Sequence, residues 1–329
     1  MILSKTPYRI SFFGGGTDYP SWYQKFGGSV VSTTINKYLY ITCRYRPNFF
    51  TSKYRISYSR IEEVQQINEI KHNVVRKILH HYKINKGMEI HYDGDLPSKS
   101  GMGSSSSFTV GLLHLLCNLK NEKISKKTLA KKSIFFEQHI LKEIVGSQDQ
   151  IAAAYGGFNK INFLKNGSFN VKKLFEKKTA ENLNKNLILI HSGIYRRAEN
   201  IAKTFVNKIK YKDSLMNQIH SLVEEAINLL NKNQYDEFGR LLGESWKLKM
   251  SLSSQITNIK INDMYNAAIA NGALGGKILG AGGGGFLLLY VPDNKKKKVL
   301  NLFKKKVVVP FKFENNGSSI INISNQKVF

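Results

Sequence analysis

The chain of 329 residues has little cysteine, no long apolar run and few acidic residues, and each shortage excludes a class of protein. Its two cysteines, Cys43 and Cys117, stand alone, so neither a zinc site nor a disulfide framework is expected. The longest apolar runs, such as residues 286–291, have the length of a strand and are too short to span a membrane. The first residues lack an uninterrupted apolar region with a cleavage site, so no signal peptide is expected. These absences favour a protein of the reducing cytoplasm.

Acidic residues are outnumbered: 23 Asp and Glu face 50 Lys and Arg, which gives a formal net charge of +27. Such a charge can indicate nucleic-acid binding, since lysines neutralise phosphates. However, only nine of the basic residues are arginine, and the lysines stand in short scattered runs without clustered arginines and aromatics. A solvated basic surface is therefore favoured over a nucleic-acid interface, and no membrane partner is expected. The same field would attract a small anionic substrate.

Hydrophobic residues make up 42% of the chain, and their pattern predicts an α+β protein of two domains. In residues 1–180 we expect strands at 8–13, 29–35, 38–46, 54–58 and 88–92, with helices at 72–82, after Gly103 and at 128–144. In residues 181–329 we expect a strand at 187–191, helices at 197–210, 215–230, 235–249 and 261–271, and a glycine-rich strand-loop-strand at 275–291. A lysine-rich helix and a strand at 307–313 follow. The order of elements in this second half resembles a ferredoxin-like fold.

Residues 96–108 read Leu-Pro-Ser-Lys-Ser-Gly-Met-Gly-Ser-Ser-Ser-Ser-Phe, a loop that runs directly into an apolar helix. Gly101 and Gly103 permit a tight turn and a close approach of the backbone to a ligand. The helix begins at the serines, so its free N–H groups and the positive end of its dipole face whatever the loop encloses. A serine hydroxyl of the first turn can also bind Mg²⁺. The pattern predicts a phosphate site, although a solvent-exposed, serine-capped helix start fits it as well.

Two common nucleotide-binding motifs are excluded. The chain contains no Gly-Lys-Ser or Gly-Lys-Thr, so it has no Walker A loop. Gly280-x-Gly282-x-x-Gly285 has the spacing of a dinucleotide-binding fingerprint, but the residues that follow predict a buried strand where that motif needs a helix. A nucleotide would therefore be bound by another device.

Three further features carry candidate chemistry. Arg9 interrupts an otherwise apolar strand ahead of Gly14-Gly-Gly-Thr-Asp18, so its charge is expected to face a polar cleft in which Asp18 accepts hydrogen bonds from sugar hydroxyls. The five glycines of residues 280–285 allow close packing against another loop or a ligand. Glu137 is expected on a helix with apolar neighbours, and Asp149 follows twelve residues later, at the start of a short Gln-Ile-Ala-Ala-Ala stretch. Taken singly, a glycine turn capped by Asp18 and surface or capping roles for the two acids are the more ordinary explanations.

Together these motifs resemble the GHMP kinases, the family of galactokinase, homoserine kinase, mevalonate kinase and phosphomevalonate kinase. The family's second motif, Pro-x-x-x-Gly-Leu-Gly-Ser-Ser, matches Pro97-Ser-Lys-Ser-Gly-Met-Gly-Ser-Ser105, and its third matches residues 277–285. The catalytic Asp-Gln pair of the sugar kinases matches Asp149-Gln150, and their Mg²⁺-binding glutamate falls on Glu137. The resemblance implies an ATP-dependent kinase with two domains, an N-terminal half shared with a ribosomal protein domain and a ferredoxin-like C-terminal half.

The same resemblance implies a role for each residue. Asp149 orients or deprotonates the sugar hydroxyl, Arg9 offsets charge beside it, and Ser105 and Glu137 hold Mg²⁺. The ATP phosphates are expected on Pro97, Ser98, Lys99, Ser100, Gly101, Met102, Gly103, Ser104, Ser105 and Ser106. Substrate contacts are expected from Gly15, Gly16, Thr17, Asp18, Ser192, Arg196, Arg197, Gly282 and Gly283.

The first motif narrows the substrate. Galactokinases have Gly-Glu-His-Thr-Asp where this chain has Gly14-Gly-Gly-Thr-Asp18, so glycine replaces both side chains that would hold a hexose. This variant resembles that of fucokinases and, most of all, of heptose 7-phosphate kinases. It implies that ATP and a sugar phosphate are the small-molecule partners of a monomer or homodimer, on a route to a GDP-heptose for surface polysaccharide. Another sugar-1-kinase, a mevalonate-type kinase, and a basic nucleic-acid-binding or sensor protein on the same fold are the alternatives.

Overall fold

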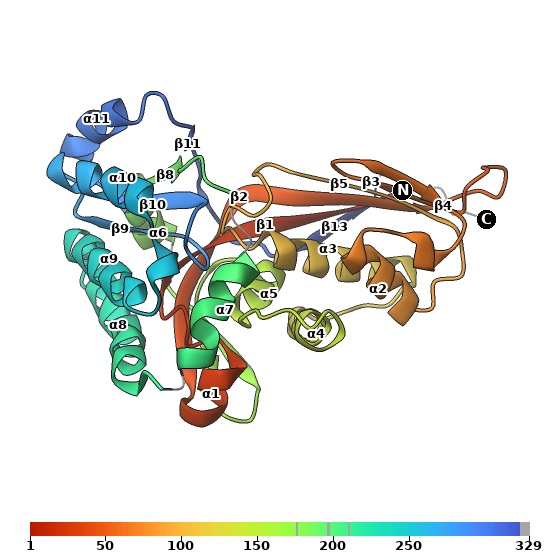
Figure 1. Ribbon diagram of the computed structural model, residues 1–329, viewed down its shortest axis with the longest axis horizontal. Coiled ribbons are helices and arrows are strands. Elements are labelled where there is room, and N and C mark those ends of the chain that lie inside the picture. The colour runs from red at the N-terminus through yellow and green to blue at the C-terminus, as the bar shows by residue number, and fades with distance from the viewer. Residues whose placement is uncertain (176, 196–197, 210, 323–329) are drawn as a thin grey trace.

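The computed structural model describes residues 1–175, 177–195, 198–209 and 211–322. Its first lobe is organised around two long strands, β1 (Ile2–Phe13) and β2 (Gly28–Tyr45), which pair antiparallel (Figure 1). The sequence predicted two separate strands at 29–35 and 38–46, which was wrong. Residues 36–37 form an irregularity opposite Pro7, where proline cannot donate to the ladder, and the pairing continues beyond it.

The edge of β2 that faces away from β1 pairs along its length with three strands. They are β6 (Phe158–Phe163), β12 (Phe313–Glu314) and β5 (Met88–Gly94). Beyond β5 the sheet continues with β3 (Tyr54–Ser57) and β4 (Ile61–Val64), and beyond β6 with β7 (Phe169–Lys173). The last strand, β13 (Ser319–Asn322), lies along β1. The C-terminal part of the chain thus completes the first sheet.

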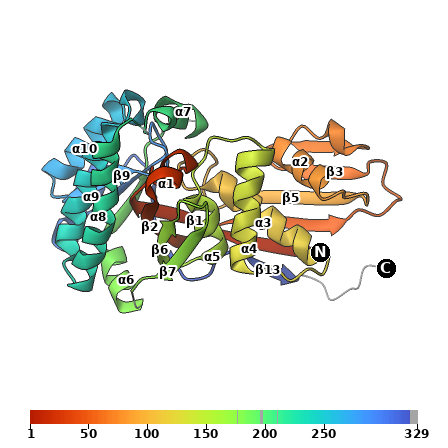
Figure 2. The same ribbon diagram turned by 90° about the horizontal axis from the view of Figure 1, so that it is seen from below.

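Helices cover one face of this sheet (Figures 1 and 2). They are α2 (Asn73–His81), α3 (Ser104–Leu119), α4 (Lys126–Phe135) and α5 (Gln148–Tyr155). The central helix α3 contacts β1, β2, α4 and α5, and it is buried on nearly all sides because its sequence is apolar around the whole circumference. The N-terminus of α3 is thereby held rigidly by the core.

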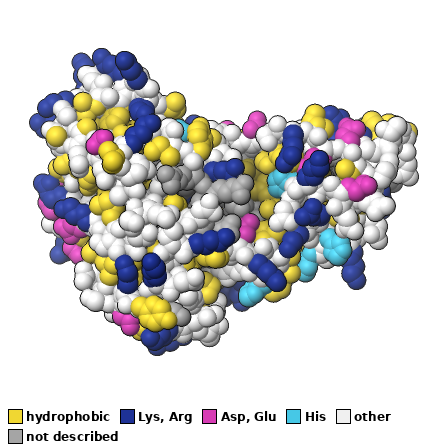
Figure 3. Space-filling model, in the orientation of Figure 1, with side chains coloured by type: hydrophobic (Ala, Val, Ile, Leu, Met, Phe, Trp, Pro, Cys, Tyr) yellow, Lys and Arg dark blue, Asp and Glu magenta, His cyan; other side chains and the backbone are white. Residues whose placement is uncertain are grey.

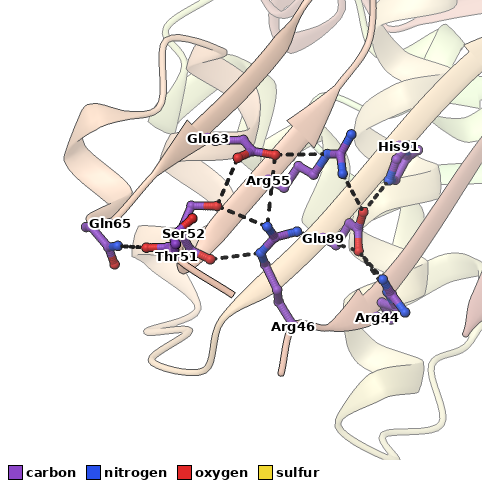
Figure 4. A network of polar contacts seen from close by, with 9 residues as sticks. All are labelled: Arg44, Arg46, Thr51, Ser52, Arg55, Glu63, Gln65, Glu89 and His91. Atoms are coloured by element: carbon purple, nitrogen blue, oxygen red, sulfur yellow. Dashed lines mark hydrogen bonds and ion pairs between the residues drawn. The ribbon is translucent and has the colours of Figure 1, made fainter. Parts of the chain in front are cut away.

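The opposite face of the sheet carries charges at the end of the lobe where β3 and β4 lie. Arg44, Glu89, Arg55 and Glu63 stand in one row across β2, β5, β3 and β4, because each is the register partner of the next (Figure 4). Arg44 Nη2 lies 2.6 Å from Glu89 Oε2, and Arg55 Nε lies 3.3 Å from Glu63 Oε1. Neighbours of opposite charge stabilise this strand pairing.

The second lobe contains a four-stranded antiparallel sheet in the order β11-β8-β10-β9. In chain order the strands are β8 (Leu187–His191), β9 (Gly275–Ile278), β10 (Phe286–Tyr290) and β11 (Val308–Val309). The spatial order 4-1-3-2 is that of the ferredoxin-like fold, as the sequence predicted. The helices of this half are α6 (Lys177–Lys185), α7 (Ala198–Ile209), α8 (Asp213–Asn231), α9 (Tyr235–Met250), α10 (Ile259–Ala270) and α11 (Asp293–Leu302).

Two expectations about organisation need revision. The division into 1–180 and 181–329 stays a prediction, but the second segment is not self-contained, because β12 and β13 belong to the first sheet. The helix predicted at 128–144 ends earlier, since α4 passes into a π-helical turn at Phe136–Ile140 and the chain then becomes irregular. Single π turns often lie at functional sites, and this one carries Glu137.

The two lobes meet through the glycines of two loops. A Cβ atom on Gly285 would lie 2.1 Å from the carbonyl oxygen of Ser100, and one on Gly280 would lie 2.7 Å from the Cα of Gly101. The amide of Phe286 donates to the same Ser100 carbonyl at 3.2 Å. The glycines of the 280–285 loop are therefore required for backbone-to-backbone packing on the loop before α3.

Substituting Gly285 by alanine tests this packing. Gly285 has φ +87°, and its Cβ would meet backbone, so we expect G285A to destabilise the protein by more than about 3 kcal/mol. Gly167 is a matched control, because it has φ +81° but no atom within 4 Å of an added Cβ. G167A should cost only the strain of the positive φ, about 1 kcal/mol. Equal losses in urea unfolding would show that the lobe contact contributes nothing.

Candidate active site

A cavity of about 350 Å³ lies between the lobes, in front of the N-terminus of α3. Both lobes line it, the first with strand β1, the turn after it and the α3 loop, and the second with α7, α9 and the 280–285 loop. Of the residues that the sequence singled out, Arg9, Gly15, Gly16, Asp18, Lys99, Gly101, Gly103, Ser104, Ser105, Ser106 and Asp149 line it.

Arg9 and Asp149 form a bidentate ion pair at the floor of this cavity. Arg9 Nε donates to Asp149 Oδ1 at 2.7 Å, and Nη2 donates to Oδ2 at 2.6 Å. The third nitrogen, Nη1, donates to the carbonyl of Gly101 at 2.6 Å. A Cβ on Gly103 would lie 3.2 Å from Asp149 Oδ2, which places the carboxylate directly beside the loop. Arg9 thus faces a polar cleft and lies beside Asp149, as expected from the sequence.

The loop before α3 has the form of an anion site. Gly101 and Gly103 have φ of +79° and +76°, so both adopt the left-handed backbone that glycine permits. Gly103 is the N-cap, and the free N–H groups of the first helical turn follow it. Ser100 and Met102 are fully buried, and the Met102 carbonyl accepts a hydrogen bond from the Arg9 amide. They anchor the loop, while Pro97 and Ser98 are exposed and lie outside the cavity lining.

Asp18 is almost completely buried in the turn after β1. It accepts hydrogen bonds from the amides of Gly16 (2.9 Å) and Gln148 (3.4 Å), and burial raises its pKa. A Cβ on Gly146 would lie 1.9 Å from Asp18 Oδ2, so any larger residue there would displace the carboxylate. Thr17 does not face the cavity, because its hydroxyl is buried against the carbonyls of Gly14 and Ser29.

Several predicted substrate contacts lie elsewhere. Gly282 packs against Ile256, and an added Cβ on Gly283 would contact Ile201. Neither these two glycines nor Ser192 line the cavity, so the structure does not place them in contact with a substrate bound there. Arg196 and Arg197 lie outside the described residues.

Sequence reasoning missed two buried lysines of the cavity, Lys249 and Lys277. Their side chains belong to the second lobe, at the end of α9 and on β9, and burial is the main cause that lowers the pKa of each. Lys277 Nζ donates to the Phe12 carbonyl at 2.7 Å. Lys277 opens the glycine-rich motif, and Lys249 falls on the apolar face of an amphipathic helix. A lysine in a glycine-rich motif and a lysine on an apolar helix face were the two sequence signals that could have indicated these cavity residues.

A second, larger cavity of about 820 Å³ lies between α6 and the segment around β11 and β12. Its floor is apolar and its rim carries lysines, with Glu181 as its only acid among the described residues that line it. The smaller cavity instead brings together two aspartates, an arginine and the N-terminus of α3, so it is the candidate active site. None of the described helices combines the length and apolarity needed to cross a membrane.

Comparison with known proteins agrees with this geometry. Residues 68–157 match the family described as the GHMP kinases N terminal domain, and residues 225–308 match the GHMP kinases C terminal. A D-glycero-alpha-D-manno-heptose 7-phosphate kinase from Campylobacter jejuni is 30% identical over 294 residues, which cover 85% of this chain and 86% of its own. The chain belongs to the GHMP kinase family. The predicted family and the prediction of an ATP-dependent carbohydrate kinase are confirmed.

Solved structures show that this GHMP kinase has the two-domain fold expected from the resemblance. A D-glycero-D-manno-heptose 1-phosphate kinase from Bacteroides thetaiotaomicron superimposes with a TM-score of 0.80, at 24% identity, over 99% of this chain and 100% of its own. A Lactococcus lactis galactokinase complexed with galactose gives a TM-score of 0.71 at 17% identity, over 97% and 95% of the two chains. At these identities the likeness concerns the fold.

Glu137 does not itself line the cavity, but it contacts Ser106, which does, and together the two offer oxygen atoms of the kind that bind a divalent cation. Glu137 is completely buried in this kinase, and its Oε2 accepts hydrogen bonds from Ser106 Oγ (2.9 Å) and from Gln150 Nε2. Its other oxygen, Oε1, is buried with no hydrogen-bond partner among the described residues. Carboxylate and hydroxyl oxygens are the ligands Mg²⁺ prefers. The serine in contact with Glu137 is Ser106, whereas the predicted Ser105 is exposed and does not contact it.

Replacing Glu137 by glutamine tests the carboxylate. Burial, and then the charge of Glu143, raise the pKa of Glu137 to about 8, so the folded protein holds a proton that the unfolded chain releases above about pH 4.5. Stability should therefore fall as pH rises from about 4.5 to 8, and E137Q should lose that dependence. Without Mg²⁺, E137Q should have the higher Tm at pH 8.5 and nearly the wild-type Tm at pH 5.

The same variant tests the cation. Mg²⁺ with ADP should raise the Tm of the wild type more than that of E137Q, because the variant lacks an anionic ligand. Glu122 is exposed, so E122Q is a matched control and should behave as the wild type. An E137Q protein that keeps the whole Mg²⁺-dependent stabilisation would exclude Glu137 as a ligand.

Proposed function

We propose that this kinase transfers the γ-phosphoryl group of ATP to the anomeric hydroxyl of D-glycero-α-D-manno-heptose 7-phosphate, giving the 1,7-bisphosphate for GDP-heptose synthesis. The observation that carries the proposal is the open turn after β1. An added Cβ at Gly15 would meet nothing closer than 3.9 Å, so glycine there leaves room in the cavity where galactokinases have a side chain. The Campylobacter jejuni relative, named as a heptose 7-phosphate kinase, supports the same substrate.

Phosphoryl transfer requires mainly that the protein positions the two substrates and neutralises the charge of the phosphates. Different residues of the cavity would serve these two purposes. The backbone N–H groups from Gly101 to Ser106 would bind the phosphate chain at the positive end of α3. Glu137 and Ser106 would hold Mg²⁺, which supplies neutralisation of phosphate charge when bound. Asp18 would accept a hydrogen bond from a sugar hydroxyl.

Asp149 would act on the attacking hydroxyl. Each of its oxygens accepts one hydrogen bond from Arg9, and each has a further lone pair for the hydroxyl proton. Arg9 fixes the orientation of the carboxylate, because the bidentate pair allows one arrangement. The position beside Gly103 brings this acceptor next to the end of the phosphate chain.

A phosphorylation screen tests the substrate. The protein is incubated with MgATP and, separately, heptose 7-phosphate, heptose 1-phosphate, fucose and galactose, and the products are identified by ³¹P NMR. We expect a new anomeric phosphate only with heptose 7-phosphate. Preferred turnover of fucose or galactose would replace the proposed substrate, and turnover of heptose 1-phosphate would move the site of phosphorylation.

Asp149 and Asp263 provide a matched pair of substitutions. D149N should lower kcat by at least about 10³-fold, because the amide is a poor proton acceptor. It should leave the affinity for MgATP nearly unchanged or stronger, since Arg9 then lacks its counter-charge. Asp263 is exposed, and D263N should match the wild type in both measurements. A D149N enzyme with most of the wild-type rate would remove Asp149 from the mechanism.

The net charge of +27 does not favour a nucleic-acid function. Figure 3 shows the lysines and arginines spread over both lobes of the visible face, not in one continuous stripe. Specific nucleic-acid proteins concentrate such charges along a groove-sized surface. The charge is consistent with attraction of ATP and a sugar phosphate. Salt-sensitive RNA binding without turnover of any sugar would reverse this conclusion.

A further inference from the structure

Lys249 is a buried cation of the active-site cavity with unused hydrogen-bond donors. It lies at the end of α9, the residue is only 9% exposed, and its Nζ donates to the carbonyl of Gly280. An ammonium group has three N–H donors, so two remain. In the part of the chain that the structure describes, no carboxylate lies within ion-pair distance of Nζ. A charge without a partner is costly in a buried position.

The other cations of the cavity are less suited to receive an anion at this position. The donors of Arg9 serve Asp149 and the Gly101 carbonyl, and its charge is balanced by Asp149. Lys277 also makes one hydrogen bond, to the Phe12 carbonyl, but it is more deeply buried than Lys249, and burial lowers its pKa well below the usual value with no carboxylate opposing the shift. Lys99 is exposed on the loop, so its charge faces solvent. Lys249 is therefore the buried cation best able to receive an anion that enters the cavity.

The position of Lys249 indicates which anion it meets. It donates to Gly280, and Gly280 packs against Gly101 of the phosphate loop, so Nζ lies where the second lobe contacts that loop. Burial, and then Arg9, lower the pKa of Lys249 to about 8, whereas Asp18 and Asp149 raise it. An anion bound here would restore the full charge of the ammonium group.

We propose that Lys249 binds the γ-phosphoryl group of ATP and stabilises the charge on its oxygens during transfer, as a catalytic residue supplied by the second lobe. This inference rests on the phosphoryl transfer proposed above. In that step the bond from the γ-phosphorus to the ADP oxygen breaks, a bond to the sugar oxygen forms, and the hydroxyl proton passes to Asp149. Lys249 donates hydrogen bonds to the non-bridging oxygens throughout and exchanges no atom.

Nucleotide binding tests this without any sugar. The affinities of K249M for Mg²⁺-AMPPNP and Mg²⁺-ADP are compared by calorimetry with those of the wild type and of K247M. Lys247 lies two residues away on the same helix and is exposed, so it is a matched control. K249M should bind AMPPNP about 10-fold more weakly and ADP within about 2-fold of the wild type, because only AMPPNP carries the third phosphate. K247M should change neither affinity.

Turnover and stability separate a catalytic role from a structural one. K249M should lower kcat by about 10²-fold, the usual effect of removing one donor to developing charge. Its Tm without nucleotide should equal or exceed that of the wild type, since a buried unpaired charge is gone. A lower Tm would indicate a structural lysine and contradict the proposal. If K249M fails to fold, K249Q, which keeps a polar end that can donate to Gly280, is measured in its place.

Two results would overturn the assignment. Unchanged AMPPNP affinity together with a raised KM for the sugar phosphate would place Lys249 on the phosphate of the sugar. Unchanged AMPPNP affinity and unchanged kcat would remove it from the site. If the wild type phosphorylates no sugar, the proposed function fails, but the comparison of AMPPNP with ADP still decides the role of Lys249.

Discussion

The ion pair between Arg9 and Asp149 is the interaction on which the rest of the site depends. Arg9 comes from the central strand β1, Asp149 from the first turn of α5, and the same guanidinium binds the Gly101 carbonyl of the loop before α3. One side chain therefore joins the three elements that would carry the phosphates, the attacking hydroxyl and the charge between them. Because the pair is bidentate and shielded, it fixes the direction of the carboxylate as well as its position.

The second lobe contributes to the same site through backbone contact. The glycines at 280 and 285 bring its loop against Gly101 and Ser100 at distances that no side chain would permit. The helix end that carries Lys249 follows from this contact, since Lys249 donates to Gly280. A site built in this way exists only while the lobes are packed together. Stability of the lobe contact and activity are for that reason coupled in this protein.

Local patterns predicted much of this arrangement. The glycine-serine loop before α3 and the strand Leu187–His191 depend on neighbours in sequence, and the structure has them where they were expected. The π turn at Phe136–Ile140 was not predicted, because a helical pattern does not show where the hydrogen-bond register slips. Lys249 was also missed, since its burial is produced by residues more than thirty positions away. The sequence predicted Ser105 beside Glu137, whereas Ser106 lies there. The two serines are neighbours on a helix, so their side chains point about 100° apart around its axis.

A structure of the protein with Mg²⁺ and AMPPNP bound would show whether the phosphate chain lies on the N-terminus of α3 and ends at Asp149. We expect phosphate oxygens on the amides of residues 101–106, the metal at Glu137 and Ser106, and the γ-phosphorus facing the Asp149 carboxylate. A nucleotide bound in the larger apolar cavity beside α6, or with its γ-phosphate pointing away from Asp149, would contradict it.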